Sequence, residues 1–395
     1  MRVSLSSKSV AAVLAAVLVF TFLAQPASAQ LGQVETPARQ MILMDFDTGT
    51  VLFEKNPDEL MPPSSMSKLM TAFMVFEQLA AGKLRLEDTL PVSEKAWRIQ
   101  GSKMFVPIGG QVKVEDLLRG VIVQSGNDAC IVLAEGIAGS EERFAELMTE
   151  RARQLGLTKS VFRNASGWPD PEHVMTAREL AMLSKLIIER FPQYYHYYAE
   201  KEFTYGIDGV TKKPITQGNR NPLLYKGGGG DGLKTGHTEA AGYGLTASAK
   251  RGDRRLILVV NGLKSMAERS RESERLMELG FSQFDNYRLF SAGAVVDEAD
   301  VWLGTQARMP LVIERNLAVT LPRQAKGSVK VVVSYDNPIP APIVKGTPVA
   351  TLRVDSKEGA LLEVPLVAGA DAQQLGFTGR IGAAVSYLLW GAGKQ

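Results

Sequence analysis

The twelve residues from Pro62 to Phe73 (PPSSMSKLMTAF) constrain the fold of this chain more than any other stretch. The proline pair stops any preceding element, and the serines after it are typical of the start of a helix. Apolar residues then recur at steps of three and four, which predicts a helix with one buried face. Ser65 and Lys68 lie three residues apart and therefore share one face at the positive end of that helix.

Two interpretations of Ser65 and Lys68 are open at this point. An isolated Ser-x-x-Lys pattern is most often an N-cap serine beside a solvated lysine. A hydroxyl beside an amine can also be a nucleophile with its base. The other motifs of the chain have to decide between the two.

The first 29 residues predict export. Arg2 and Lys8 precede an apolar run from Val10 to Leu23, and Ala27-Ser28-Ala29 has the form of a cleavage site, so we expect residues 1–29 to be a signal peptide. The apolar run is too short to span a bilayer comfortably. Removing it takes the formal net charge from +3 to +1 (3 − 2), which gives no reason to expect nucleic acid as a partner. We expect the mature protein in the periplasm.

Cysteine and histidine are scarce. Cys130 is the single cysteine, which excludes an intrachain disulfide framework and a cysteine-based zinc site. His173, His196 and His237 are far apart in the sequence, which disfavours a metal cluster. The sequence therefore predicts neither a metal nor another cofactor.

Periodicity divides the mature chain into two domains and a tail. An early hairpin, helices in the middle and two late strand-like runs predict an α/β (α+β) domain over residues 30–287, in which helices flank one mixed sheet closed by the first and last segments (hairpin 40–55; helices 141–155, 176–190 and 268–279; strands 244–249 and 254–261). Short strand-like runs separated by Pro- and Gly-bearing turns predict a small all-β domain over residues 288–375 (301–303, 317–321, 329–335, 348–354 and 361–367). Helical spacing returns in residues 376–395.

Three short patterns follow one another in order, each occurring once: Ser65-x-x-Lys68, Ser125-Gly126-Asn127 and Lys234-Thr235-Gly236. This trio is known from serine β-lactamases and penicillin-binding proteins. The chain resembles the low-molecular-mass penicillin-binding proteins, the serine-type D-Ala-D-Ala carboxypeptidases of peptidase family S11. The resemblance covers nearly the whole mature chain, and departs from the family's usual residues at Ser67 and in the glycine run 227–230.

The resemblance implies a β-lactamase/transpeptidase-like domain with an antiparallel sheet, and a function. Such an enzyme removes the terminal D-alanine from peptidoglycan pentapeptide stems through an acyl-enzyme on Ser65, and β-lactam antibiotics acylate and inhibit it. Lys68 would be the base and Ser125 would pass its proton to the leaving amine. Backbone N–H groups of Ser65 and His237 would form the oxyanion hole. The other implied substrate-binding residues are Asn127, Lys234, Thr235 and Gly236, with Arg269 holding the C-terminal carboxylate and Arg220 shaping the pocket.

Physical chemistry agrees with these roles. Lys68 can act as a base only as a neutral amine, although a free lysine has a pKa of about 10.4. Burial, the helix terminus and a second cation, Lys234, would lower the pKa of Lys68. Ordinary structural roles are the alternatives: Asn127 can cap the helix that follows it, and Arg269 can pair with Glu268 or Glu272 on the surface.

Rival functions share the motifs. A class A β-lactamase uses a glutamate four residues before an asparagine, and no Glu-x-x-x-Asn occurs between Asn127 and Lys234. An endopeptidase of the same fold usually lacks the C-terminal β-domain. A non-catalytic wall-binding scaffold has no need of the base Lys68. The sequence favours the carboxypeptidase.

The C-terminal tail predicts an interfacial helix. One helical side carries apolar residues and Trp390 closes the segment (Phe377, Ile381, Val385, Leu388 and Leu389). We expect this helix to hold the protein peripherally on the outer face of the inner membrane. The alternative is that it folds back onto the β-domain.

Overall fold

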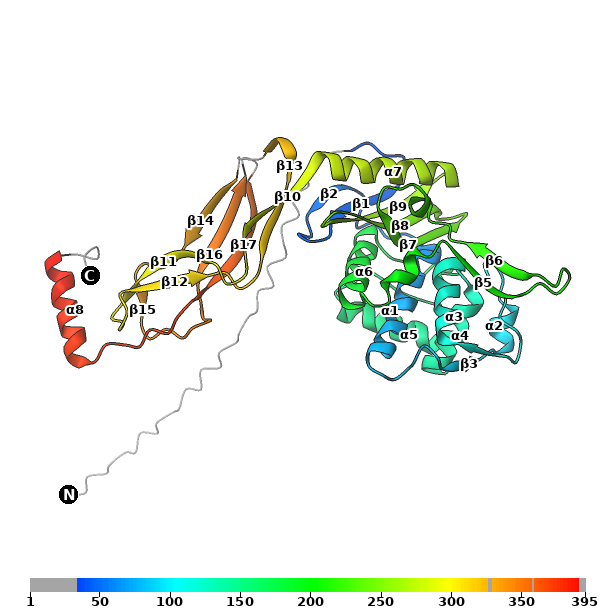
Figure 1. Cartoon of the computed structure of the whole chain (residues 1–395), viewed down its shortest axis with the longest axis horizontal. Coiled ribbons are helices and arrows are strands. Elements are labelled where there is room, and N and C mark those ends of the chain that lie inside the picture. Colours follow the sequence, from blue (N-terminus) through cyan, green and yellow to red (C-terminus); the bar gives the residue numbers. More distant parts are fainter. Residues whose placement is uncertain (1–33, 326–328, 357–358, 391–395) are drawn as a thin grey trace, which may run out of the picture.

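The structure is a computed structural model that describes residues 34–325, 329–356 and 359–390. The chain forms a larger mixed unit and a smaller β-rich unit, and the C-terminal helix lies beyond the β-rich unit at one end of the long axis (Figure 1). The predicted signal peptide lies outside the described residues.

A five-stranded antiparallel sheet organises the larger unit, with strand order β2-β1-β9-β8-β7. The first two strands pair with the last three, as the sequence predicts, because β1 lies against β9 along its whole length. The central strand β9 has an unbroken buried run from Leu256 to Val260, as expected of a strand covered on both faces. The bounds are β1 Gln40–Asp45, β2 Val51–Lys55, β7 Gly230–Thr238, β8 Gly242–Arg251 and β9 Arg254–Leu263.

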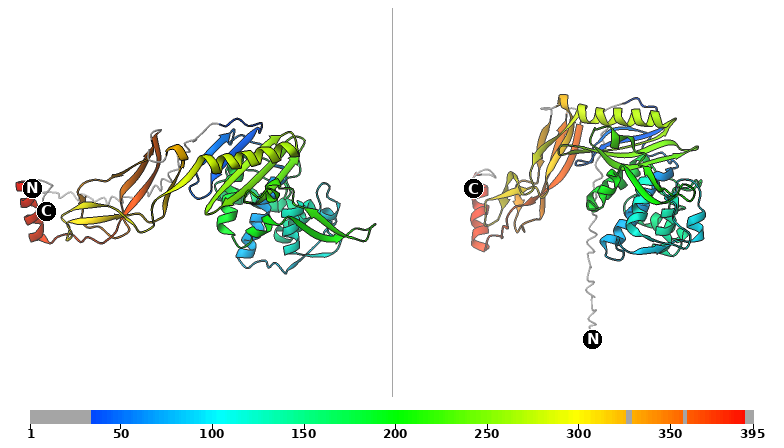
Figure 2. Two further views of the ribbon diagram at one scale, coloured as in Figure 1. Left: turned by 45° about the horizontal axis from the view of Figure 1, so that its top comes forward. Right: turned by 45° about the vertical axis from the view of Figure 1, so that its right-hand side comes forward.

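Alternate residues of the sheet supply two separate cores. Ile257 and Val259 face the larger helical layer, whereas Leu256 and Leu258 face α7 (Met266–Gln283) on the other side. Figure 2 shows α7 alone on its face of the sheet and the remaining helices on the other. These helices are α1 Lys68–Ala80, α2 Glu94–Arg98, α3 Val114–Arg119, α4 Asn127–Ala138, α5 Glu141–Gln154 and α6 Ala177–Arg190.

Helix α1 is the central helix of the larger unit. Every residue from Lys68 to Phe76 is buried, whereas the sequence pattern predicted burial of one face of the helix only. The serines before it form a separate 3₁₀ turn, η1 (Ser64–Ser67). The residue Lys68 therefore opens a helix that is enclosed on all sides.

The N-terminus of α6 has one half of a capping box, in which the first residue caps the helix and a Glu three residues later would bond back to it. The Thr176 hydroxyl accepts a hydrogen bond from the backbone N–H of Glu179 at 3.1 Å, as an N-cap should. The Glu179 carboxylate does not reach back. It accepts instead from the backbone N–H of Lys159 at 2.8 Å and from the hydroxyl of Ser160 at 2.5 Å. Glu179 thus fastens a loop to the helix start.

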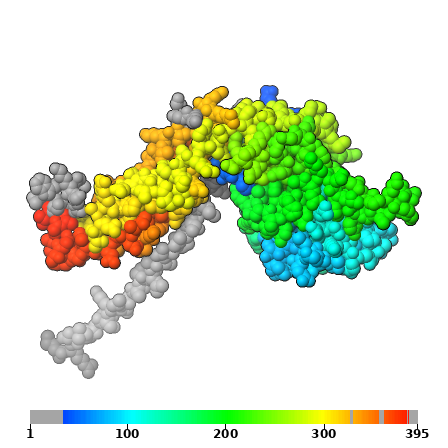
Figure 3. All heavy atoms as spheres, viewed as in Figure 1, coloured from blue at the N-terminus to red at the C-terminus, as the bar shows by residue number. Residues whose placement is uncertain are grey.

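Two small two-stranded sheets accompany the helical layer. One pairs β3 (Thr89–Pro91) with β4 (Gln111–Lys113), which α2 separates in the chain, and the other is the hairpin of β5 (Glu202–Ile207) and β6 (Pro214–Gly218). The hairpin β5–β6 projects outward from the larger unit (Figures 1 and 3).

The β-rich unit confirms the predicted all-β module. A six-stranded sheet has the order β14-β16-β17-β12-β11-β15, and β10 pairs with β13. The sequence did not predict β10 or β12. The predicted domain boundary between residues 287 and 288 falls within β10 and stays a prediction. Bounds are β10 Phe284–Phe290, β11 Val295–Trp302, β12 Arg308–Val312, β13 Leu317–Pro322, β14 Lys330–Ser334, β15 Ile339–Pro340, β16 Pro348–Ser356 and β17 Gly359–Ala368.

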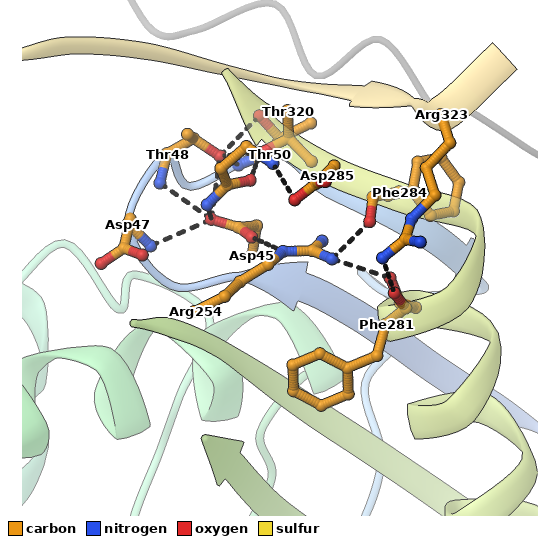
Figure 4. Close-up of polar contacts among 12 residues, drawn as sticks. Asp45, Asp47, Thr48, Thr50, Arg254, Phe281, Phe284, Asp285, Thr320 and Arg323 are labelled. Atoms are coloured by element: carbon orange, nitrogen blue, oxygen red, sulfur yellow. Dashed lines mark hydrogen bonds and ion pairs between the residues drawn. The ribbon is translucent and has the colours of Figure 1, made fainter. Parts of the chain in front are cut away.

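A buried carboxylate joins the two units (Figure 4). Asp45, at the end of β1, is fully buried. Its Oδ1 accepts from the backbone N–H of Thr48 at 3.1 Å and from the amide of Asn286, in β10, at 3.0 Å. Its Oδ2 pairs with Arg254 at 2.9 Å. The hydroxyls of Thr48 and Thr320, in β13, lie 2.5 Å apart. Because α7 ends at residue 283 and β10 begins at 284, this cluster fixes the junction without a linker.

The tail forms the predicted helix, α8 (Phe377–Trp390). Phe377, Ile381 and Val385 are 72%, 51% and 49% exposed, so about half or more of each of these apolar side chains is accessible. The side chains of Leu388, Leu389 and Trp390 lie outside the described part. Within the described residues, none of the helices is both long and apolar enough to cross a membrane.

Candidate active site

Ser65 and Lys68 meet as the sequence predicts. The Nζ of Lys68 lies 2.9 Å from the Oγ of Ser65. Lys68 is 1% exposed, whereas Ser65 is only half-buried and remains accessible. The solvated-lysine interpretation is therefore wrong. A lysine without solvent must find its hydrogen-bond partners within the protein.

Two further acceptors complete the surroundings of Lys68. Its Nζ donates to the Oδ1 of Asn127 at 2.8 Å and to the backbone carbonyl of Ser166 at 2.6 Å. The amide of Asn127 also donates from Nδ2 to the carbonyl of Gln100 at 2.8 Å. Because a carbonyl can only accept, that bond fixes the orientation of the amide and leaves Oδ1 facing Lys68.

These partners suit a neutral amine. An uncharged amine has two N–H bonds and one lone pair. The oxygens of Asn127 and Ser166 can only accept, so they take the two N–H bonds. The lone pair then remains for Ser65, whose hydroxyl can donate as well as accept. The hydrogen bond between Ser65 and Lys68 is thus the one of the three that can reverse its direction.

Electrostatics shift Lys68 toward the same state. Burial is the main cause that lowers the pKa of Lys68 from 10.5 to about 8; the charge of Arg220 contributes to this shift, and the charges of Asp128 and Glu141 oppose it. Burial also lowers the pKa of Lys234 well below its ordinary value, and the charge of Lys68 adds to that effect. Two ammonium groups in one buried site disfavour each other's charge.

Ser125 pairs with the second lysine. It has a left-handed backbone (φ 64°) at the end of a short π-helical segment (η2, Gly120–Gln124), and it is 1% exposed. The Nζ of Lys234, in β7, donates to the Oγ of Ser125 at 3.0 Å. The sequence predicted a proton path from Lys68 to Ser125. The hydrogen bond that the structure contains at this serine comes from Lys234.

Strand β7 lies directly against the turn that carries Ser65, which explains Gly236. A Cβ at Gly236 would lie 2.9 Å from the carbonyl oxygen of Pro63 and 3.1 Å from Met66. The hydroxyls of Ser64 and Thr238 are 3.1 Å apart across the same contact. Thr235 is buried beside them. The exposed His237 stacks its ring on Tyr243, with centroids 3.9 Å apart.

Arg269, in α7, is 5% exposed and points toward Arg220 rather than toward a carboxylate. Its Nη2 donates to the carbonyl of Arg220 at 3.1 Å, and its buried Nε has no partner. Glu268 and Glu272 bond elsewhere, to the N–H of Lys264 and to Arg275, so the alternative in which Arg269 pairs with one of them on the surface is excluded. Burial lowers the pKa of Arg269 to about 10, and the charge of Arg220 adds to that.

Cations dominate the whole site. Lys68, Lys234, Arg220 and Arg269 all lie here, and in the described part of the chain none of them has a carboxylate within 4.0 Å. Uncompensated buried positive charge is costly unless an anion arrives. The arrangement is therefore suited to an anionic ligand.

Two side chains that hold this site, Asn164 and Asp128, were not predicted from the sequence. The Asn164 side chain accepts from the N–H of Gly167 at 2.8 Å and of Trp168 at 3.0 Å, and so shapes the loop that presents the carbonyl of Ser166 to Lys68. The fully buried carboxylate of Asp128 accepts backbone N–H bonds from residues 104, 105 and 106. A backbone carbonyl has no sequence signature, but Asn-x-x-Gly is a recognisable turn pattern.

The hydroxyl of Ser65 lies on the amine of the buried Lys68, and a second serine–lysine pair, Ser125 with Lys234 of β7, lies in the same site. This arrangement is that of a serine hydrolase that works through an acyl-enzyme. Comparison with known proteins identifies which one. Residues 25–265 match the D-alanyl-D-alanine carboxypeptidase family (peptidase family S11), and residues 284–374 match the C-terminal domain of penicillin-binding protein 5. The chain belongs to the D-alanyl-D-alanine carboxypeptidase family.

Individual relatives agree with this assignment. The chain is 40% identical to the D-alanyl-D-alanine carboxypeptidase DacC of Escherichia coli, over 93% of each chain. The structure superposes on the crystal structure of penicillin-binding protein 5 from Haemophilus influenzae with a TM-score of 0.80, over 86% of this chain and 99% of that one. The two sequences are 35% identical. Penicillin-binding protein D2 from Listeria monocytogenes, solved with ampicillin bound, is 30% identical over 63% of this chain and 99% of its own, with a TM-score of 0.56.

Gly167 tests how the site is held. A Cβ there would lie 1.9 Å from the carbonyl oxygen of Ser64, and φ is +76°. Gly82, just beyond α1, has φ +66°, and a Cβ there would have no atom within 4 Å, so it matches the backbone strain without the clash. We expect Gly167→Ala to slow acylation by a fluorescent penicillin at least tenfold, while Gly82→Ala acylates normally and loses about 1 kcal/mol of stability. Equal acylation by the two variants would contradict this.

Proposed function

We propose that this protein removes the terminal D-alanine from peptidoglycan pentapeptide stems through an acyl-enzyme on Ser65. One observation carries the residue assignment: the two N–H bonds of a neutral Lys68 are taken by acceptor-only oxygens, which leaves its lone pair facing the Ser65 hydroxyl 2.9 Å away. A base positioned in this way can take the serine proton as the oxygen attacks.

The reaction then proceeds in balanced steps. The Oγ of Ser65 attacks the carbonyl carbon of the scissile peptide bond while its proton moves to Lys68. The oxyanion that forms is stabilised by the backbone N–H groups of Ser65 and His237. The C–N bond breaks as the departing D-alanine takes a proton from the Ser125 hydroxyl, which is replenished from an ammonium. Lys234 donates to Ser125 at 3.0 Å and replaces that proton, and Lys68 passes the proton taken from Ser65 to Lys234, which returns Lys68 to the neutral amine. Lys68 then takes a proton from the water that attacks the ester carbonyl, and it gives this proton to the Oγ of Ser65 as the ester C–O bond breaks and the shortened stem leaves.

Recognition of the substrate rests on the cations. The free C-terminal carboxylate of the stem is held by Thr235 and Arg269, whose unpartnered Nε can donate to it. Lys234 adds positive charge, and Gly236 allows the strand β7 to lie beside the nucleophile. Asn127 fixes Lys68 and offers its second amide hydrogen to the substrate. Arg220 holds the hydroxyl of Ser102 at 2.8 Å and shapes the rim.

β-Lactams acylate the same serine under this proposal, because their strained amide resembles the scissile bond. Class A β-lactamases hydrolyse the drug ester with a water that a glutamate activates. Here the glutamate whose charge acts on Lys68 is Glu141, and its carboxylate already accepts the N–H of Ala165 and pairs with Lys95. It is therefore not free to activate a water, and deacylation of the drug ester is slow. The carboxypeptidase is therefore favoured over the β-lactamase.

Ser65→Ala tests the nucleophile. We expect it to abolish both the release of D-alanine from a pentapeptide ending in D-Ala-D-Ala and labelling by a fluorescent penicillin, because the variant lacks the hydroxyl that faces the lone pair of Lys68. Circular dichroism would verify that the variant is folded. Persistent labelling would place the nucleophile at another residue.

Arg269→Ala tests carboxylate recognition. A charge-assisted hydrogen bond is worth about 1.5–3 kcal/mol, so kcat/KM for peptides with a free C-terminus should fall roughly ten- to a hundred-fold. The same peptide with an amidated C-terminus is the control, and its slower turnover should not fall further. A matching loss on the amidated peptide would assign Arg269 a structural role instead.

The same proposal includes the location of the protein. Residues 1–29 direct export and are removed, the enzyme faces the periplasm, and α8 lies on the inner membrane. Three exposed apolar residues on α8 support this (Phe377, Ile381 and Val385). Arg380 is a positive charge on the same helix, so apolar burial supplies most of the affinity.

Truncation tests the anchor. A chain that stops before Gly376 should appear in the soluble periplasmic fraction, whereas the full chain should sediment with membranes and resist a salt wash. Penicillin labelling of both chains controls for folding. The anchor proposal fails if both chains wash off membranes equally easily.

A further inference from the structure

The base of the hairpin β5–β6 contacts residues next to the active site, and its tip is exposed. The amide of Gln124, next to Ser125, donates to the carbonyl of Phe203 in β5 at 2.9 Å. From β6, Gln217 donates to the carbonyl of Lys103 at 2.8 Å. Arg220, two residues beyond β6, bonds Ser102. Whatever contacts this hairpin therefore lies next to the mouth of the site.

The tip of the hairpin is folded and apolar. The carboxylate of Asp208 accepts from the N–H of Val210 at 3.0 Å and from the hydroxyl of Thr211 at 2.8 Å, so the turn is ordered by its own bonds. Ile207 is nevertheless 68% exposed and Val210 is 91% exposed. The fold of the hairpin gains nothing from apolar side chains at these places, because they contact water rather than a core.

Charge at the tip is positive. Lys212 and Lys213 are exposed. The one acidic residue of the turn, Asp208, holds the turn through its Oδ1, and these hydrogen bonds lower the pKa of its carboxyl group. A strip of exposed aliphatic carbon beside two ammonium groups suits a partner that carries both methyl groups and carboxylates.

Phe105 extends this chemistry to the base of the hairpin. It is 51% exposed and has a left-handed backbone with φ 68°, which is strained for an aromatic residue. Asp128 holds it there by accepting its N–H at 2.8 Å. Gly206 of β5 lies against it, since a Cβ on that glycine would be 3.7 Å from the carbonyl of Phe105. Strain of this kind is typical of functional sites.

We propose that the hairpin β5–β6, with Phe105 at its base, binds the peptidoglycan polymer beside the stem that occupies the active site. The inference rests on the proposed function. Stems neighbouring the reacting one carry alanine methyl groups and free carboxylates, which match the aliphatic and basic tip. A membrane is a poorer match, because α8 and the hairpin lie at opposite ends of the long axis in both Figure 1 and Figure 2.

The test compares polymer with short peptide. Two variants change the tip: Ile207→Ser with Val210→Ser, and Lys212→Glu with Lys213→Glu. The control is Val295→Ser with Val344→Ser, which removes two apolar side chains of the β-rich unit that are 56% and 67% exposed. Substrates are intact peptidoglycan sacculi and a soluble pentapeptide ending in D-Ala-D-Ala, and D-alanine release is measured on both.

The tip variants should release D-alanine from sacculi on the order of tenfold more slowly than wild type, and sediment less with sacculi. Their turnover of the pentapeptide, and all activities of the control, should stay at the wild-type level. The proposal is overturned if the tip variants release D-alanine from sacculi at the wild-type rate. That result would stand against it even if the variants lost binding to a protein partner or to a second copy of the chain. Equal losses on both substrates would also overturn it. Absence of release by the wild type from either substrate would refute the proposed function itself.

Discussion

The side chain of Lys68 is enclosed by protein, and the rest of the site follows from the cost of that burial. A pKa lowered from 10.5 to about 8 means that folding disfavours the ammonium form by roughly 3 kcal/mol. This cost is present in full below pH 8 and fades as the pH rises toward 10.5, where the unfolded chain also loses the proton. Two acceptor-only oxygens and one hydroxyl accept hydrogen bonds from the ammonium and offset part of this cost. When the amine is neutral, the two acceptor-only oxygens keep its two N–H bonds and the hydroxyl of Ser65 faces its lone pair.

The fold supplies this surrounding through close contacts between backbone segments. Gly236 lets β7 touch the turn that carries Ser65, and Gly167 brings the carbonyl of Ser166 over the start of α1. Behind them, Asp128 and Asn164 hold the loops through backbone N–H groups. The second buried carboxylate, Asp45, has a different task, because it ties the five-stranded sheet to the β-rich unit and so sets the orientation of the two units.

The features of the fold that depend on hydrophobic periodicity and on motif spacing could be predicted from the sequence. The early hairpin, the sheet closed by distant segments, the all-β module and the meeting of Ser65 with Lys68 are all present. The patterns missed contacts made by backbone atoms, such as the carbonyl of Ser166, and long-range pairs such as Thr48 with Thr320. Residues with competing partners were also beyond their reach: the carboxylate of Glu179 holds a loop, and the guanidinium of Arg269 donates to the backbone carbonyl of Arg220.

The role of Lys68 as the base requires a pKa far enough below that of a free lysine for a substantial fraction of the side chain to be neutral, and a titration of that side chain tests this directly. Carbon-13 NMR of lysine-labelled enzyme, with the resonance assigned by its loss in Lys68→Arg, reports the protonation of each lysine separately. The structure predicts a midpoint near 8 for Lys68, more than two units below that of a free lysine at about 10.4. A midpoint at or above 10 would show that Lys68 remains an ammonium ion in the resting enzyme, and would contradict its role as the base.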